Sequence, residues 1–152
     1  MKVEQRLREL GLELPPSVRP VATYVRFLQT GNLLFVSGTG PSEAAPKGKV
    51  DAEVSVEQAY GLAREVGLQL LATAKDALGD LDRIVRVVKL LGMVNSSPEF
   101  DRQPQVINGC SDLLVEVLGD AGRHTRSAVG MAALPNRIAV EIECTFEVRP
   151  TD

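Results

Sequence analysis

The chain has 152 residues, a length that fits one domain built around one hydrophobic core. Hydrophobic residues make up 44% and charged residues 24% of the chain, which is typical of folded globular proteins and excludes a disordered or fibrous one. The net charge is −3 and aromatic residues are only 4%, so the basic surface and stacking rings of most nucleic-acid binders are not expected. No nucleic-acid partner is predicted.

Two further classes are excluded by local patterns. The longest apolar runs, such as residues 33–36, are far shorter than the roughly 20 residues that span a membrane. The charged start Met1-Lys2-Val3-Glu4 does not resemble a signal peptide, so we expect a cytoplasmic protein with no membrane contact. Cys110 and Cys144 have no partners at metal-ligand spacing and are interpreted as reduced core thiols.

The N-terminal third predicts a helix followed by a β-hairpin. Apolar residues at helical spacing over residues 2–11 indicate a short amphipathic helix, within an extension (residues 1–17) that precedes the main domain (residues 18–152). The chain is β-rich from Val21 to Leu28, and Thr30-Gly31-Asn32 is turn chemistry before the strand at residues 33–36. Residues 38–50 are dense in Gly, Pro and small residues and predict a surface loop.

The middle of the chain predicts a long helix and a long strand. Ser55 and Gln58 form a capping-box pattern, and apolar residues then repeat at helical spacing as far as Gly79. Small residues on one helix face, among them Gly67, favour close packing against a sheet. Residues 83–94 are rich in β-branched side chains and predict a strand.

The C-terminal part predicts a second long helix and two strands. Pro104 suits a first helical turn, and the helix should run to Gly119. Residues 126–133 and 138–148 indicate two strands joined around residues 134–137, with glutamates on one face of the second strand. The order α-ββ-α-β-α-ββ predicts an α+β fold, in which two long helices cover one face of a mostly antiparallel sheet. The other sheet face is then either solvated or packed against another subunit.

Several separate segments occur in an order that resembles a known family. They are Tyr24 ahead of Gly31-Asn32, Val36-Ser37-Gly38, Asn108, Arg126-Ser127-Ala128-Val129, Ala133-Leu134-Pro135 and Val140-Glu141-Ile142-Glu143. Over residues 18–149 the chain resembles the RidA family, also called the YjgF or liver perchloric-acid-soluble protein family. The resemblance implies a chorismate-mutase-like fold and a homotrimer around a central barrel, with pockets in the clefts between subunits. It implies hydrolysis of enamines and imines, such as 2-aminoacrylate, to a 2-keto acid and ammonia. No cofactor or metal is implied.

Two charged residues match the family's reacting groups. Arg126 matches the carboxylate-binding arginine, and a guanidinium can hold a small carboxylate-bearing metabolite by two parallel hydrogen bonds. Glu141 matches the position of a carboxylate that orients water and moves its proton. On alternation alone, Glu141 is equally an outward-facing strand glutamate.

Other positions match the pocket lining. Tyr24 and Asn108 match residues that orient the substrate, and backbone groups at Ser37-Gly38 and at Ser127-Ala128 match positions close to it. His124 is the sole histidine, two residues before Arg126. It is either an acid-base group or incidental.

Some positions depart from the family pattern. Many relatives carry cysteine at the position of Ala128, and Gly130 and Thr39-Gly40-Pro41 also differ. The resemblance therefore indicates a divergent subgroup whose members bind different or larger acids.

Three functions remain open at this point. The leading hypothesis is a hydrolase similar to 2-iminobutanoate/2-iminopropanoate deaminases. The second is a trimer that binds or senses a metabolite carboxylate without turnover. The third is an endoribonuclease, which the acidic charge balance and few aromatic residues disfavour.

Overall fold

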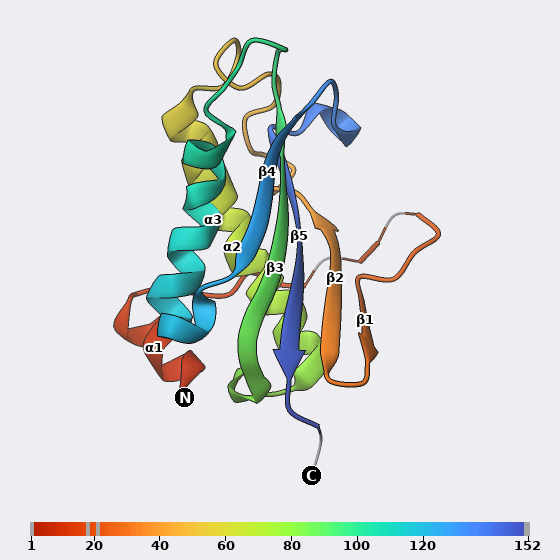
Figure 1. Cartoon of the computed structure of the whole chain (residues 1–152), viewed down its shortest axis with the longest axis vertical. Coiled ribbons are helices and arrows are strands. Elements are labelled where there is room, and N and C mark those ends of the chain that lie inside the picture. Colours follow the sequence, from red (N-terminus) through yellow and green to blue (C-terminus); the bar gives the residue numbers. More distant parts are fainter. Residues whose placement is uncertain (1, 18, 21, 151–152) are drawn as a thin grey trace.

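The computed structural model describes residues 2–17, 19–20 and 22–150. In that part of the chain, five strands form one mixed sheet in the order β1-β2-β5-β3-β4. The strands are β1 (Phe27–Thr30), β2 (Leu33–Thr39), β3 (Ile84–Asn95), β4 (Thr125–Met131) and β5 (Val140–Val148). The α-helices are α1 (Val3–Glu9), α2 (Val56–Leu78) and α3 (Gln103–Leu118). Figure 1 shows α2 and α3 side by side along one face of the sheet, which confirms the predicted α+β layering.

The predicted hairpin and the first long helix are confirmed. Strands β1 and β2 pair antiparallel around the Gly31-Asn32 turn, where Gly31 has a φ of +58°. Strand β1 starts only at Phe27, and Val21 lies outside the described residues. The capping box at the start of α2 is formed, since Ser55 and Gln58 each accept a hydrogen bond from the other's backbone N–H.

The predicted neighbour relation of the last two strands is wrong. Strand β3 lies between them, pairing parallel with β4 and antiparallel with β5. The physical reason is that α3 carries the chain from β3 to β4, and a helical crossover returns the next strand in the parallel direction. The remaining pairings, β1 with β2 and β2 with β5, are antiparallel, so the sheet is mostly antiparallel as predicted.

The two long helices approach closely because glycines lie at their contact. A Cβ atom added to Gly109 of α3 would lie only 2.0 Å from the carbonyl oxygen of Tyr60 in α2. A Cβ added to Gly67 of α2 would lie 2.6 Å from the Leu113 side chain in α3. The prediction that Gly67 packs against the sheet is therefore wrong, because it packs against the other helix.

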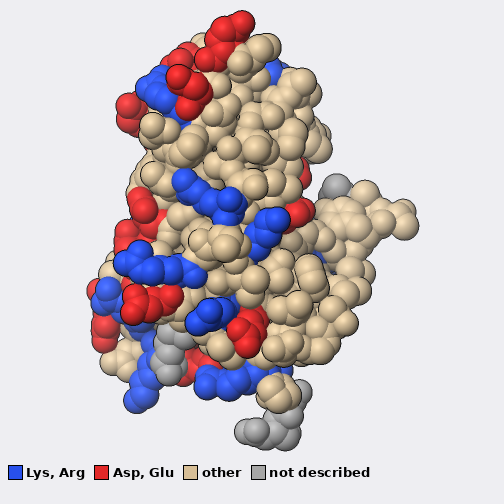
Figure 2. Space-filling view, in the orientation of Figure 1, with Lys and Arg blue, Asp and Glu red and all other residues tan. Residues whose placement is uncertain are grey.

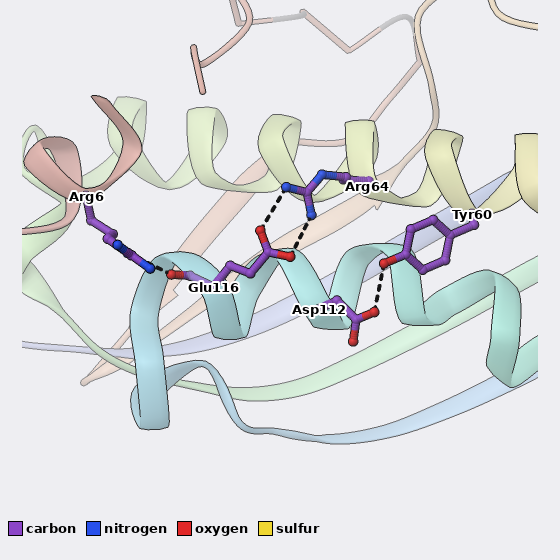
Figure 3. Close-up of polar contacts among 5 residues, drawn as sticks. All are labelled: Arg6, Tyr60, Arg64, Asp112 and Glu116. Atoms are coloured by element: carbon purple, nitrogen blue, oxygen red, sulfur yellow. Dashed lines mark hydrogen bonds and ion pairs between the residues drawn. The ribbon is translucent and has the colours of Figure 1, made fainter. Parts of the chain in front are cut away.

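Polar contacts join the same helices on their outer side (Figure 3). Both terminal nitrogens of Arg64 donate to the Glu116 carboxylate, at 3.1 and 2.9 Å, and the Tyr60 hydroxyl donates to Asp112 at 2.8 Å. From α1, the Nε of Arg6 donates to the backbone carbonyl of Glu116 at 3.1 Å. These contacts hold α3 in place beside β4.

The N-terminal helix packs onto the same core. Val3 and Leu7 of α1 are buried among the core residues, and the backbone N–H of Val3 donates to Asp82. Cys110 and Cys144 are also buried in this core and form no disulfide. None of the described helices has the length and apolar character needed to cross a membrane.

Candidate functional site

Arg126 lies on β4, the edge strand next to α3. Its Nη1 donates to the Ser111 hydroxyl at 3.0 Å, and its Nη2 points to the carbonyl oxygen of Pro104 at 3.4 Å. Both partners belong to α3, so the guanidinium extends to the helix-covered side of the sheet. On that side Arg126 pairs in register with Leu90 of β3, and Leu90 pairs with Cys144 of β5. Both Leu90 and Cys144 are buried.

The charge of Arg126 is not neutralised by any carboxylate in the described part of the chain. Among the described residues, no carboxylate lies within ion-pairing distance of it, whereas Arg123 pairs with Asp120 and Arg137 pairs with Glu53. The half-buried guanidinium therefore keeps N–H donors free for an anion from outside the chain.

His124 is connected to Arg126 through Ser111. The Nε2 of His124 lies 2.8 Å from the Ser111 hydroxyl, and its Nδ1 lies 2.6 Å from the carbonyl oxygen of Gly122. Burial lowers the pKa of His124, the nearby Arg126 lowers it further, and the Gly122 hydrogen bond opposes this shift. The imidazole is therefore neutral at pH 7.

Asn108 and Ala128 lie on the same side as Arg126. Asn108 is half-buried and comes three residues before Ser111 and four after Pro104, so all three share a face of α3. Ala128 is two residues beyond Arg126 on β4 and packs against the core. Ser127, between them, is exposed and faces the opposite side of the sheet.

Glu141 lies on the sheet face that the helices leave bare. Its neighbours Val140 and Ile142 are fully buried on the helix side, so alternation directs Glu141 to the other face. Its carboxylate covers Gly38 of β2, where an added Cβ would lie 2.5 Å from Oε2. Partial burial raises the pKa of Glu141, and the negative charge of Glu143 raises it further.

Ser37 and Tyr24 lie towards the opposite edge of the sheet from Arg126. The Ser37 hydroxyl donates to the carbonyl oxygen of Val25 at 2.7 Å, and Tyr24, just before β1, is 48% exposed. Next to Ser37 is a hollow of about 400 Å³. Its lining includes Phe35, Ser37, Glu143 and Thr145.

Seven of the eight predicted site residues therefore form two groups in one chain, and Ser127 belongs to neither. The first, called here the β4 group, consists of Arg126, Asn108 and Ala128 between β4 and α3. The second, called the β2 group, consists of Tyr24, Ser37, Gly38 and Glu141 around β1, β2 and β5. With β3 and the thickness of the sheet between them, Arg126 and Glu141 lie on opposite faces and do not meet within one chain.

Sequence reasoning missed Ser111. A serine within a helix is common and gave no reason for selection. Its spacing from Pro104 and Asn108 was the available indication, because residues three and four apart share a helix face.

The sheet, the two covering helices and the strand order define an α+β domain of the chorismate-mutase-like class. Residues 4–142 match the model of a family described as "YjgF/chorismate_mutase-like, putative endoribonuclease". The chain therefore belongs to the YjgF family, also called the RidA family, as the sequence resemblance indicated.

Individual relatives agree with this placement. "Protein TCP17" of Trypanosoma cruzi is 42% identical over 151 residues, which cover 97% of this chain and 94% of that protein. The crystal structure of Atu1372, a protein of unknown function from Agrobacterium tumefaciens, is 48% identical with a TM-score of 0.89, covering 97% of this chain and 92% of that one. A "putative endoribonuclease" from Shewanella oneidensis is 30% identical with a TM-score of 0.93, covering 97% and 100%.

Proposed function

We propose that this protein hydrolyses imine and enamine forms of amino acids to 2-keto acids and ammonia. The observation that carries the proposal is the guanidinium of Arg126, which α3 holds and which no carboxylate among the described residues pairs. An imino acid has a carboxylate next to its C=N carbon, and two parallel N–H···O bonds from arginine fix that carboxylate in one orientation. The reacting carbon is then held at a set distance from the arginine.

Glu141 supplies the proton transfers in this proposal. Water adds to the C=N carbon of the protonated imine, one water proton passes to the Glu141 carboxylate, and a carbinolamine forms. Glu141 then returns this proton to the amine nitrogen. The C–N bond breaks and ammonia leaves with the bonding electrons, while the hydroxyl loses its proton to the Glu141 carboxylate and forms the keto group. A carboxylate whose pKa is raised is a stronger base than an ordinary glutamate and accepts a water proton more readily, which favours Glu141 for this role.

The site requires a second copy of the chain, because the β4 group and the β2 group lie on opposite faces. In a closed ring of identical subunits, the β4 group of one copy meets the β2 group of the next. Exposed apolar side chains on strands β1, β2 and β4 support such an interface, among them Phe27, Phe35 and Val129. We therefore propose a homotrimer with one pocket at each interface.

A distant structural relative guides the choice of ligand. E. coli TdcF, 21% identical with a TM-score of 0.62, has been solved with bound serine, which carries a carboxylate and an amino nitrogen on one carbon. The imines of serine, alanine and 2-aminobutyrate are therefore suitable substrates for a first test.

Surface charge gives less support to an RNA substrate. Figure 2 shows basic and acidic side chains close together over much of the face viewed, and the whole chain is acidic with a net charge of −3. A protein that holds an RNA backbone usually gathers its basic residues in a continuous patch.

The decisive experiment measures ammonia release from imines that an amino-acid oxidase generates in the same cuvette. We expect Arg126→Ala to lower the rate at least about 100-fold, because the substrate loses its charged anchor. Arg123→Ala is the matched control, since Arg123 is 71% exposed in its side chain and pairs with Asp120. Equal rates for wild type and a folded Arg126→Ala would refute the proposal.

The same variants separate an enzyme from a sensor. If keto acids bound saturably to wild type and not to Arg126→Ala, while ammonia release stayed at the background rate, the protein would be a carboxylate-binding trimer.

A further inference from the structure

A directed chain of hydrogen bonds leads from Arg126 into the protein. The carbonyl oxygen of Gly122 can only accept, so the Nδ1 of His124, 2.6 Å away, carries the imidazole proton. In a neutral imidazole the Nε2 is then an acceptor, and the Ser111 hydroxyl, 2.8 Å away, donates to it. The Ser111 oxygen is left to accept from Nη1 of Arg126 at 3.0 Å.

The direction of the serine hydrogen matters for the arginine. A serine inside a helix can turn its hydroxyl back to the carbonyl four residues earlier, here Ile107. With a neutral imidazole as acceptor, the hydroxyl instead points to His124 and presents its lone pairs to the guanidinium. The second anchor, the carbonyl oxygen of Pro104, lies 3.4 Å from Nη2 and alone is a weak restraint.

We propose that Ser111 and His124 are positioning residues that fix the guanidinium of Arg126 in the orientation that receives the substrate carboxylate. This inference rests on the proposed function of Arg126 and adds the two residues that act through it. Neither Ser111 nor His124 touches the substrate in this account. Their effect is on the affinity for carboxylates more than on the chemical step.

The burial of His124 supports the same arrangement. Burial and the charge of Arg126 both lower the pKa of the imidazole, which keeps Nε2 available as an acceptor at neutral pH. Two groups face the imidazole. Arg126 of β4 is connected to it through Ser111 of α3, and the Gly122 carbonyl lies on the preceding turn.

The hydrogen-bond chain is tested directly by nitrogen-15 NMR, because His124 is the only histidine in the chain. At pH 7.5 we expect the tautomer with hydrogen on Nδ1. Ser111→Ala should shift the Nε2 resonance downfield, since that nitrogen loses its hydrogen-bond donor. A hydrogen on Nε2, or an Nε2 resonance that Ser111→Ala leaves in place, would overturn the inference.

The positioning role is tested by calorimetric binding of pyruvate and by steady-state kinetics. Ser111→Ala and His124→Ala should each raise the Kd for pyruvate about 3- to 10-fold, the loss expected for one hydrogen bond. KM should rise by a similar factor while kcat changes less than about twofold. Ser111→Thr, which keeps the hydroxyl, should retain wild-type affinity.

The double variant separates positioning from a general structural effect. If His124 acts through Ser111, Ser111→Ala combined with His124→Ala should bind pyruvate no more weakly than the weaker single variant. If the two losses of affinity simply multiplied in the double variant, the inference would be wrong.

Binding by Arg126→Ala distinguishes a failure of this inference from a failure of the proposed function. Arg126→Ala binding as well as wild type would contradict the proposed function, whereas a loss of binding confined to Arg126→Ala would contradict only the positioning role.

Discussion

Arg126 and Glu141 carry opposite charges, yet neither neutralises the other within one chain. The guanidinium is held by neutral oxygen atoms of α3, and the glutamate faces Gly38 and a second glutamate on the bare sheet face. Half-buried charges without partners reduce stability, and proteins keep them mainly where function requires them.

The raised pKa of Glu141 predicts a gain in stability when its charge is removed. Because the pKa of Glu141 is higher in the folded chain, the folded chain binds more protons than the unfolded chain above pH 4.5. The free energy of unfolding therefore falls as the pH rises through the folded-state pKa. We expect Glu141→Gln to raise the Tm at pH 7 and to leave it nearly unchanged at pH 4. The same variant should lose ammonia release, because the amide cannot take a proton.

Differential scanning calorimetry at the two pH values checks this prediction. Glu99→Gln, at an exposed loop position, is the control for a general effect of net charge. A Tm gain that was equal at pH 4 and pH 7 would contradict the assignment to ionisation.

The lowered pKa of His124 predicts the opposite pH dependence. In the unfolded chain His124 binds a proton near pH 6.5, whereas in the folded chain it does so only at lower pH. The contribution of His124 to the free energy of unfolding is therefore complete above pH 6.5 and falls as the pH drops below it. We expect the Tm of wild type to fall more between pH 7.5 and pH 5.5 than that of His124→Gln. Parallel Tm curves for the two proteins would show that His124 titrates normally.

The sequence could be used to select candidate site residues, but it could not predict how they are arranged. Arg126 and Glu141 were found because each lies in a run of residues that matches the family. Strand alternation also placed Glu141 on the polar face. For β4, both alternating sets contain small and polar residues, so the strand alone does not decide which side Arg126 occupies. That side depends on its contact with Ser111 in α3, the preceding helix.

At the scale of elements, the α2 and α3 contact depends on the absence of a side chain at Gly109. Because an added Cβ would overlap the Tyr60 carbonyl, Gly109→Ala forces the helices apart and should cost about 1–3 kcal/mol or more of unfolding free energy. Gly61→Ala is the matched control in α2, where an added Cβ meets nothing within 4 Å and should stabilise by about 1 kcal/mol. Urea titration measures both, and equal effects would contradict the packing argument.

Prediction of the elements succeeded where the determinants are local. Helix α2 begins at a capping box and ends before Gly79, and both boundaries are encoded within a few residues. The order of strands is encoded differently. Strand β4 pairs with β3 rather than β5 because α3 intervenes in the chain, and recognising β3-α3-β4 as a crossover unit would have predicted it.

At the scale of the whole molecule, the proposed site needs more than one copy of the chain. The β4 group and the β2 group use different faces and different edges of a single sheet. A ring of three copies would cover the sheet face that the helices leave bare and complete a pocket at each interface. Light scattering should therefore give about three times the monomer mass of 16.4 kDa. A strict monomer would exclude the composite site.

Mixed trimers test whether Arg126 and Glu141 act across an interface. Arg126→Ala and Glu141→Gln should each be inactive alone. When the two are co-expressed in equal amounts, random assembly gives an intact pair at about a quarter of the interfaces, provided that each contact is heterologous. Ammonia release should then recover to about a quarter of the wild-type rate, with Arg126→Ala co-expressed with wild type as the reference for mixing. If both residues acted within one chain, every subunit would carry one defect and no mixture of the two variants would regain activity.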